Sequence, residues 1–448
     1  MRFKAWLAAV LLIAATLAAL PEFQQGPALI PLPQAKRDVL STAEQVTVTH
    51  PAFTGSLGNV ARRGAYLAYA RHLADGLRAP VTYTALLEAE DLLLQRLHDP
   101  HSALTELWLP DTNPDLLPVG FYWAADGLVA YRVEGSPAAL QTGDRVISIG
   151  GLDDQRLLRR MRRYFSGNLP WLKTLAGEEL PLGNTLRWFG VVQDDAVRLE
   201  LERPSGRRYT LAVPLVPQSL AADDAYTEGR AAFAARYLAP QGMAEPQGGR
   251  PYAWRLTPDY GIFWLTSSLD TSGYRKAVDR FFKAVRSAGV YYVVIDLAEN
   301  PGGYATVANP LLRHLPLRPA MLGDVPAAVR AQNPAEVFRG KVYVLIDGGS
   351  MSAAVYTAEM LSEWGEAELV GQPAGMATGA FVGPKTFLTP DRRVAYQVST
   401  TFLPAVDGVQ AASLQPAVAL PVTVRDIQRG VDPVANWLSD LATPRVKT

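Results

Sequence analysis

Short apolar runs and amphipathic stretches alternate along the C-terminal part of the chain. From residue 260 onward, runs typical of buried strands are followed by stretches with the spacing of helices. Strands are expected at 261–265, 290–297, 342–346 and 368–370, and helices at 274–288, 305–315 and 353–363, with Pro310 interrupting the second helix. Such a series packs most naturally as a parallel sheet covered by helices. We therefore predict an α/β fold for residues 260–448.

Five segments with other patterns precede this region. Arg2 and Lys4, followed by an apolar run, predict a signal peptide or N-terminal anchor, and hence an extracytoplasmic protein that is periplasmic, bound to the cell envelope or secreted. The next segment is rich in Pro, Gln and Thr and has weak periodicity, which predicts an extended linker. The predicted segments are 1–20 (signal peptide or anchor), 21–51 (linker), 52–110 (two helices, broken near Ala79-Pro80), 111–217 (β-rich domain) and 218–259 (connection).

Charge and cysteine content limit the chemistry. The 448 residues carry 43 basic and 43 acidic side chains, and cysteine is absent. A balanced charge argues against nucleic acid as a partner and leaves the N-terminal anchor as the only expected membrane contact. Without cysteine the chain has no disulfide, no thiolate metal site and no cysteine nucleophile. Any nucleophile must be an oxygen or nitrogen group, and neither a metal nor a cofactor is expected.

Two predicted strands end in glycine-rich turns that suit catalysis. Residues 295–303 end in Asn-Pro-Gly-Gly, where backbone N–H groups would suit an oxyanion hole or an anion site. Residues 344–354 carry Ser350 and Ser352 at the start of a helix, where a nucleophile would lie near the helix dipole. The plainer interpretations are a strand-to-helix turn and a serine N-cap. Spacing alone leaves both pairs of alternatives open.

Five stretches, taken in order, resemble the tail-specific (C-terminal processing) serine peptidases, peptidase family forty-one. The two turns, with the Leu-Val-Gly-Gln-Pro of residues 369–373 after them, are similar to the core of that family. Asp99-Pro100-His101-Ser102 resembles the element that carries the base in its histidine-containing branch. Residues 140–151 are similar to its PDZ-like domain, and residues 429–434 resemble its closing segment. The resemblance covers residues 98 to 438.

The resemblance implies a crotonase-like catalytic core with an N-terminal helical region and an inserted PDZ-like domain. It implies that Ser352 is the nucleophile and that backbone N–H groups of Gly302 or Gly303 and of Ala353 form the oxyanion hole. His101 is implied as the general base. The family's other solution is a lysine after the serine, and the corresponding segment of this chain has none.

Other roles that the resemblance implies are less closely defined. Lys385 lies too far along the chain to fit the lysine solution well.

In the PDZ-like domain, the turn that would hold a peptide's terminal carboxylate contains Val119, Gly120 and Phe121. The third catalytic residue, which would orient His101, is not identifiable from a motif. Its candidates are Asp99, Glu359, Asp407 and Gln410.

The chain also departs from the family pattern. Val355 stands where the family usually has glutamate three residues after the nucleophile, and Glu359, one helical turn later, is the candidate replacement. His101 has plainer interpretations too, as a structural histidine or as a metal pair with His98. Pro100 between the two histidines disrupts the helical face that such a pair requires.

The sequence therefore predicts an exported serine endopeptidase that hydrolyses proteins or peptides through an acyl-enzyme. The alternative is a catalytically degenerate peptide-binding protein on the same scaffold. A crotonase-like enzyme acting on a thioester is a weaker alternative, because such enzymes rarely carry an export signal or a PDZ-like insert.

Overall fold

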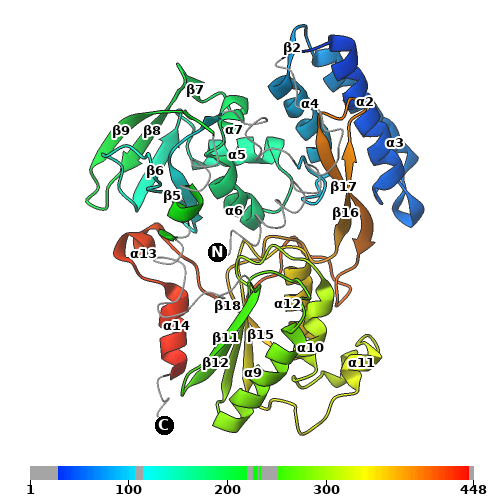
Figure 1. Cartoon of the computed structure of the whole chain (residues 1–448), viewed down its shortest axis with the longest axis vertical. Coiled ribbons are helices and arrows are strands. Elements are labelled where there is room, and N and C mark those ends of the chain that lie inside the picture. The colour runs from blue at the N-terminus through cyan, green and yellow to red at the C-terminus, as the bar shows by residue number, and fades with distance from the viewer. Residues whose placement is uncertain (1–28, 106–114, 219–225, 231, 234–249, 443–448) are drawn as a thin grey trace.

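The computed structural model describes residues 29–105, 115–218, 226–230, 232–233 and 250–442 (Figure 1). The predicted signal peptide or anchor at 1–20 and most of the predicted connection at 218–259 lie outside these residues. Over the part of the chain that is described, no helix is both long enough and apolar enough to cross a membrane.

The C-terminal part forms a six-stranded sheet in the order β11-β12-β13-β14-β15-β18. β11 runs antiparallel to β12, and every other neighbouring pair is parallel. The strands are β11 (Tyr252–Leu256), β12 (Tyr260–Leu265), β13 (Tyr292–Asp296), β14 (Lys341–Ile346), β15 (Glu368–Gly371) and β18 (Val418–Ala419). The predicted parallel α/β arrangement is confirmed.

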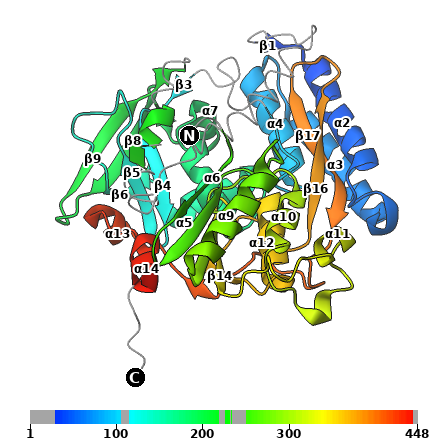
Figure 2. The ribbon, with the colours of Figure 1, turned by 60° about the horizontal axis from the view of Figure 1, so that its bottom comes forward.

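Helices cover both faces of this sheet, with α14 on one side and α9, α10 and α12 on the other (Figure 2). Alternate strand residues serve the two faces: Phe263 and Ile295 pack toward α9, while Trp264 and Val294 pack toward α14. The helices are α9 (Tyr274–Ala288), α10 (Ala308–Leu312), α11 (Ala327–Arg330), α12 (Ala353–Glu363), α13 (Val424–Arg429) and α14 (Pro433–Ala442), with 3-10 turns η2 (Ala305–Val307) and η3 (Pro319–Met321). The predicted helix at 305–315 is thus shorter and begins as a 3-10 turn.

Three helices form the N-terminal region: two lie within residues 52–110, where two were predicted, and a further helix precedes them. The predicted break near Ala79-Pro80 separates α3 from α4, but the predicted linker is wrong over most of its length, because residues 32–49 form α2. Ala35, Val39, Ala43 and Val46 recur at helical spacing and are fully buried. Their side chains are small, so the pattern is weak in the sequence. The elements are β1 (Leu29–Ile30), α2 (Leu32–Thr49), η1 (Gly55–Leu57), α3 (Val60–Gly76), β2 (Val81–Thr82) and α4 (Tyr83–Gln95).

The region predicted to be β-rich contains a second sheet, in the order β4-β5-β6-β8-β7 with β9 also paired to β8. It also contains three helices between β6 and β7 that the sequence analysis missed. The elements are β3 (Asp115–Leu116), β4 (Gly120–Ala124), β5 (Gly127–Tyr131), β6 (Asp144–Ile149), α5 (Asp154–Tyr164), α6 (Leu169–Glu179), α7 (Gly183–Trp188), β7 (Val192–Gln193), β8 (Ala196–Glu202), β9 (Arg208–Pro214) and β10 (Val216–Pro217).

A long hairpin, β16 (Ala380–Leu388) and β17 (Ala395–Leu403), lies between the six-stranded C-terminal sheet and the N-terminal helices (Figure 1). The Tyr83 hydroxyl donates to the carbonyl of Arg393 at 2.6 Å. Leu104 forms a β-bridge with Tyr396. Residues 99–105 are therefore attached to a hairpin that belongs to the C-terminal part of the chain.

Candidate active site

The two glycine-rich turns lie side by side at the carboxyl ends of β13 and β14, and hydrogen bonds hold them together. Oδ1 of Asp347 accepts from the backbone N–H of Glu299 at 2.8 Å and from that of Ser350 at 3.0 Å. The N–H of Met351 donates to the carbonyl of Asn300 at 2.9 Å. The relative position of the two turns is therefore fixed before any substrate binds.

Ser350 is one of the residues that join the turns. Its side chain is fully buried. Its Oγ donates to the carbonyl of Leu297 at 2.8 Å and accepts from the backbone N–H of Asp347 at 3.0 Å. This hydroxyl already donates one hydrogen bond and accepts another, so Ser350 has a structural role.

Ser352 differs from Ser350 in backbone and side chain. It occupies the N-cap position of α12, yet its side chain forms no capping hydrogen bond, so the N-cap interpretation does not apply. Its φ of 51° and ψ of −122° place a non-glycine residue in a sparsely populated region. Holding a residue there costs on the order of 1–3 kcal/mol, and such strain is found most often at active sites. Ser352 is thus held in a strained turn with an unengaged hydroxyl.

Two free backbone donors lie next to Ser352. A Cβ on Gly302 would be 2.6 Å from the Cβ of Ser352 and 3.0 Å from the backbone N of Ala353, so only glycine allows this approach. The N–H of Gly302 itself donates to Oδ1 of Asn300 at 2.9 Å. The N–H groups of Gly303 and Ala353 have no acceptor among the described residues. This geometry favours Gly303 over Gly302 as the partner of Ala353 in an oxyanion hole.

His101 lies beside a buried carboxylate, Asp99. Nδ1 of His101 is 3.7 Å from Oδ1 of Asp99, and the His101 backbone N–H donates to the same oxygen at 3.0 Å. The other oxygen accepts from the Ser102 hydroxyl at 2.6 Å and lies 3.3 Å from Nε2 of His50. Burial alone would raise the pKa of Asp99, but its contacts with His101, His50 and Ser102 outweigh burial and lower it. Asp99 is therefore a stable negative charge next to His101.

His50 was not found by sequence reasoning. It follows α2, in the segment predicted to be a linker, and its ring is fully buried. Its Nδ1 accepts from the backbone N–H of Ala52 at 3.1 Å, so the proton is on Nε2, which faces Asp99. No local motif marks this residue, because its role arises only when the N-terminal helices pack on the loop at 99–102.

A cavity of about 370 Å³ brings these parts together. His101, Gly302, Gly303 and Met351 line it, and Ser352 adjoins Gly302 and follows Met351 in the chain. The structure thus gathers the predicted base and the predicted oxyanion glycines, from segments 200 residues apart, around one space beside the predicted nucleophile.

The other predicted orienting residues serve different contacts. Oε1 of Glu359 accepts from the N–H of Val406 at 2.6 Å, and Oδ1 of Asp407 accepts from that of Val409 at 2.8 Å. Gln410 lines a separate cavity with His98, and Lys385 lies exposed on β16. Over the described residues, no group of three or more His, Asp or Glu side chains is arranged to hold a metal ion.

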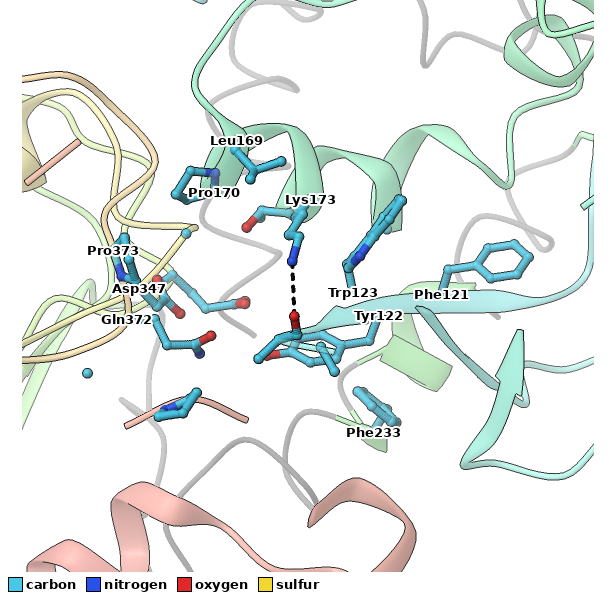
Figure 3. Close-up of a pocket in the computed structure, with 18 of the residues that line it drawn as sticks. Phe121, Tyr122, Trp123, Leu169, Pro170, Lys173, Phe233, Asp347, Gln372 and Pro373 are labelled. Carbon is cyan, nitrogen blue, oxygen red and sulfur yellow. Dashed lines mark hydrogen bonds between the residues drawn. The ribbon is translucent and has the colours of Figure 1, made fainter. Parts of the chain in front are cut away.

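A second cavity, of about 290 Å³, lies between β4, α6 and the carboxyl ends of the catalytic strands (Figure 3). Phe121 lines it, whereas Val119 and Gly120 do not. The N–H of Val119 already donates to the carbonyl of Leu117 at 2.7 Å, so a peptide carboxylate would have to displace this bond. Lys173 extends from α6 and donates to the carbonyl of Ala125 at 3.4 Å (Figure 3).

Comparisons with known proteins find similar folds and one matching family. Among solved structures, mature CPAF complexed with lactacystin is 14% identical with a TM-score of 0.64, over 92% of this chain and 98% of that chain. Mature CPAF on its own is 15% identical with a TM-score of 0.62, over 92% and 96%. A photosystem II D1 C-terminal processing protease is 14% identical with a TM-score of 0.40, over 89% and 98%. No curated protein sequence matches.

The structural likeness to CPAF extends over nearly the full length of both chains and concerns the fold. The sequence evidence is narrower. The model of peptidase family S41 matches residues 260–420, which include Gly303, Ser352 and Ala353 but not His101. Through these residues the C-terminal part of the chain is similar to peptidase family S41, a family of serine-type peptidases that act on proteins or peptides.

Proposed function

We propose that this chain is an exported serine endopeptidase in which Ser352 is the nucleophile, His101 the general base and Asp99 the residue that orients His101. In this proposal the catalytic sheet is a crotonase-like core, the domain at 115–217 is PDZ-like, and the segment at 1–20 directs the chain out of the cytoplasm.

The observation that carries the proposal is the backbone conformation of Ser352 together with the hydrogen bonding around it. Its backbone is strained, and its side chain makes no capping hydrogen bond. Gly302 lies against it, and the N–H groups of Gly303 and Ala353, the residues that follow Gly302 and Ser352, have no acceptor among the described residues. A serine that only capped a helix would need neither strain nor adjacent donors. Ser350, two residues earlier, differs from Ser352 in that its hydroxyl is buried and forms two hydrogen bonds.

The chemistry follows from these positions. His101 removes the proton of Ser352 as Oγ bonds to the peptide carbonyl carbon, and the carbonyl oxygen becomes an oxyanion held by Gly303 and Ala353. The C–N bond then breaks, and the amine leaves with the proton from His101. Water attacks the acyl-enzyme, gives a proton to His101, and releases the acid while Oγ regains its proton. The Asp99 carboxylate, with Oδ1 3.7 Å from Nδ1 of His101, stabilises the charged form of the ring, and a small shift that shortens this distance would also orient it.

Labelling with a fluorophosphonate tests the proposal. We expect the wild-type chain to be modified at Ser352 and to cleave an unfolded protein substrate. Ser352→Ala should lose both properties while it remains folded. A folded wild-type chain without label or cleavage would favour the peptide-binding alternative, to which the buried Val355 in place of glutamate points.

A further inference from the structure

The cavity beside Ser352 contains two buried carboxyl groups that the proposed mechanism does not use. Asp91 on α4 and Glu179 on α6 line the same space as His101 and Gly303. Their exposed fractions are only 4% and 3%. They belong to two different helices, so the fold, and not local sequence, brings two acidic groups to this cavity.

Neither carboxyl group has a cationic partner among the described residues. Oε2 of Glu179 accepts from the Thr185 hydroxyl at 3.1 Å. Oδ2 of Asp91 is buried and has no hydrogen-bond partner in the part of the chain that the structure describes. The other charges that raise the pKa values of the pair are also acidic, Glu88 for Asp91 and Glu178 for Glu179. An unpartnered carboxylate oxygen in a cavity wall is costly unless a ligand supplies its partner.

The neighbouring acids are themselves satisfied. Glu88 accepts from the Tyr164 hydroxyl at 2.8 Å, and Glu178 pairs with Arg230 at 2.8 Å. The structure has no hydrogen bond between Asp91 and Glu179 that would join α4 to α6. The pair therefore does not act as a structural clamp between these helices.

Burial changes the protonation of the pair. It raises the pKa of Asp91 well above its ordinary range, and the charges of Glu179 and Glu88 raise it further. Burial raises the pKa of Glu179 to about 8; the hydrogen bond from Thr185 lowers this pKa somewhat, and the charge of Glu178 raises it. Burial and the neighbouring acids therefore favour the neutral form of both groups, and an entering cation would favour their charged form.

We propose that Asp91 and Glu179 form an acidic specificity pocket that binds the lysine or arginine side chain of the substrate residue next to the scissile bond, an inference that rests on the proposed peptidase function. The walls of the cavity include Phe165, Trp171 and Leu175, which can pack against the methylene stem of such a side chain. Its ammonium or guanidinium group then donates to the two carboxylates.

Two peptidyl diphenyl phosphonates that differ in one side chain test this proposal. One carries a lysine side chain on the carbon next to phosphorus, and the other carries norleucine, which has a similar stem without the charge. Ser352 Oγ bonds to phosphorus and displaces phenoxide, so the inactivation rate reports how well the side chain is bound. We expect the lysine reagent to react about tenfold faster or more.

Matched variants locate the effect. Asp91→Asn combined with Glu179→Gln should reduce the ratio of the two rates to about one. Glu90→Gln removes a buried carboxyl group from the next position of the same helix, outside the cavity, and should leave the ratio unchanged. Asp91→Asn alone, which should lower the ratio, replaces the double variant if that does not fold.

A fluorophosphonate without a side chain separates this proposal from the peptidase function. If it labels Ser352 but the lysine and norleucine reagents react equally fast, the specificity pocket is wrong and the peptidase function stands. If it does not label Ser352, the peptidase function fails. The pocket is then tested by the binding of Nα-acetyl-lysine amide and Nα-acetyl-norleucine amide to the full chain, where equal affinities overturn it.

Discussion

Replacing Ser352 with glycine should stabilise the protein while it abolishes catalysis. The φ of 51° and ψ of −122° cost a non-glycine residue on the order of 1–3 kcal/mol, and glycine avoids most of that cost. Glycine also adds about 0.4–1 kcal/mol of conformational entropy to the unfolded chain. With the middle of each range, the balance makes Ser352→Gly more stable than Ser352→Ala by about 1 kcal/mol.

Urea unfolding followed by tryptophan fluorescence measures this difference, with cleavage of a peptide substrate as the second readout. Ser352→Ala is the reference, because it removes a hydroxyl that forms no capping bond and leaves the strained backbone in place. Ala353→Gly is the control, since Ala353 begins α12 outside the positive-φ region. It should lose about 0.5–1 kcal/mol.

The sign of the difference in unfolding free energy between Ser352→Gly and Ser352→Ala shows whether residue 352 is strained. If Ser352→Gly were less stable than Ser352→Ala by about as much as Ala353→Gly is less stable than wild type, residue 352 would carry no strain. The inference from its backbone to an activated serine would then fail.

Three further predictions concern the general base, the His50 contact with Asp99 and a buried acid on α4. His101→Ala should lower kcat by several orders of magnitude and Lys385→Ala should change it little; the reverse pattern in steady-state kinetics would assign the base to the lysine. His50→Leu should lower kcat more than it raises KM, because it removes the contact between Nε2 of His50 and Asp99. His50→Gln should restore part of the loss, because glutamine can still donate to Asp99. Equal effects of the two variants would show that the hydrogen bond to Asp99 is unimportant. Burial raises the pKa of Glu90 from 4.5 to about 8, so the stability due to its protonation is full below pH 4.5 and is lost as pH rises toward 8. In urea unfolding at a series of pH values, Glu90→Gln should reduce this decline in the free energy of unfolding by about 1.4 kcal/mol per pH unit. An unchanged slope would contradict the prediction.

The strongly periodic elements could be predicted from the sequence almost to the residue. The helices at 274–288 and 353–363 have the predicted bounds. The first carries large apolar residues on one face and ends at Gly289 in the left-handed conformation, which marks its C-terminus clearly. By contrast, α2 buries mainly alanine, valine and threonine, which give a weak periodic signal and led to the incorrect linker.

The site could be predicted only as far as its chemistry is local. The serine, the glycines and the Asp99-His101 element lie in short motifs. His50, Asp91 and Glu179 lie in helical or loop segments with no motif, and only tertiary packing brings them to Asp99 or to the cavity. The sequence also could not distinguish Ser350 from Ser352 by spacing, whereas their backbone and hydrogen bonds do.

The most direct test is a crystal structure of the wild-type chain after reaction with the fluorophosphonate. The account predicts a covalent bond from phosphorus to Oγ of Ser352. It also predicts the phosphoryl oxygen within about 3.1 Å of the backbone N atoms of Gly303 and Ala353, with His101 beside the adduct. An adduct on any other residue, or a phosphoryl oxygen that points away from these two N–H groups, would contradict it.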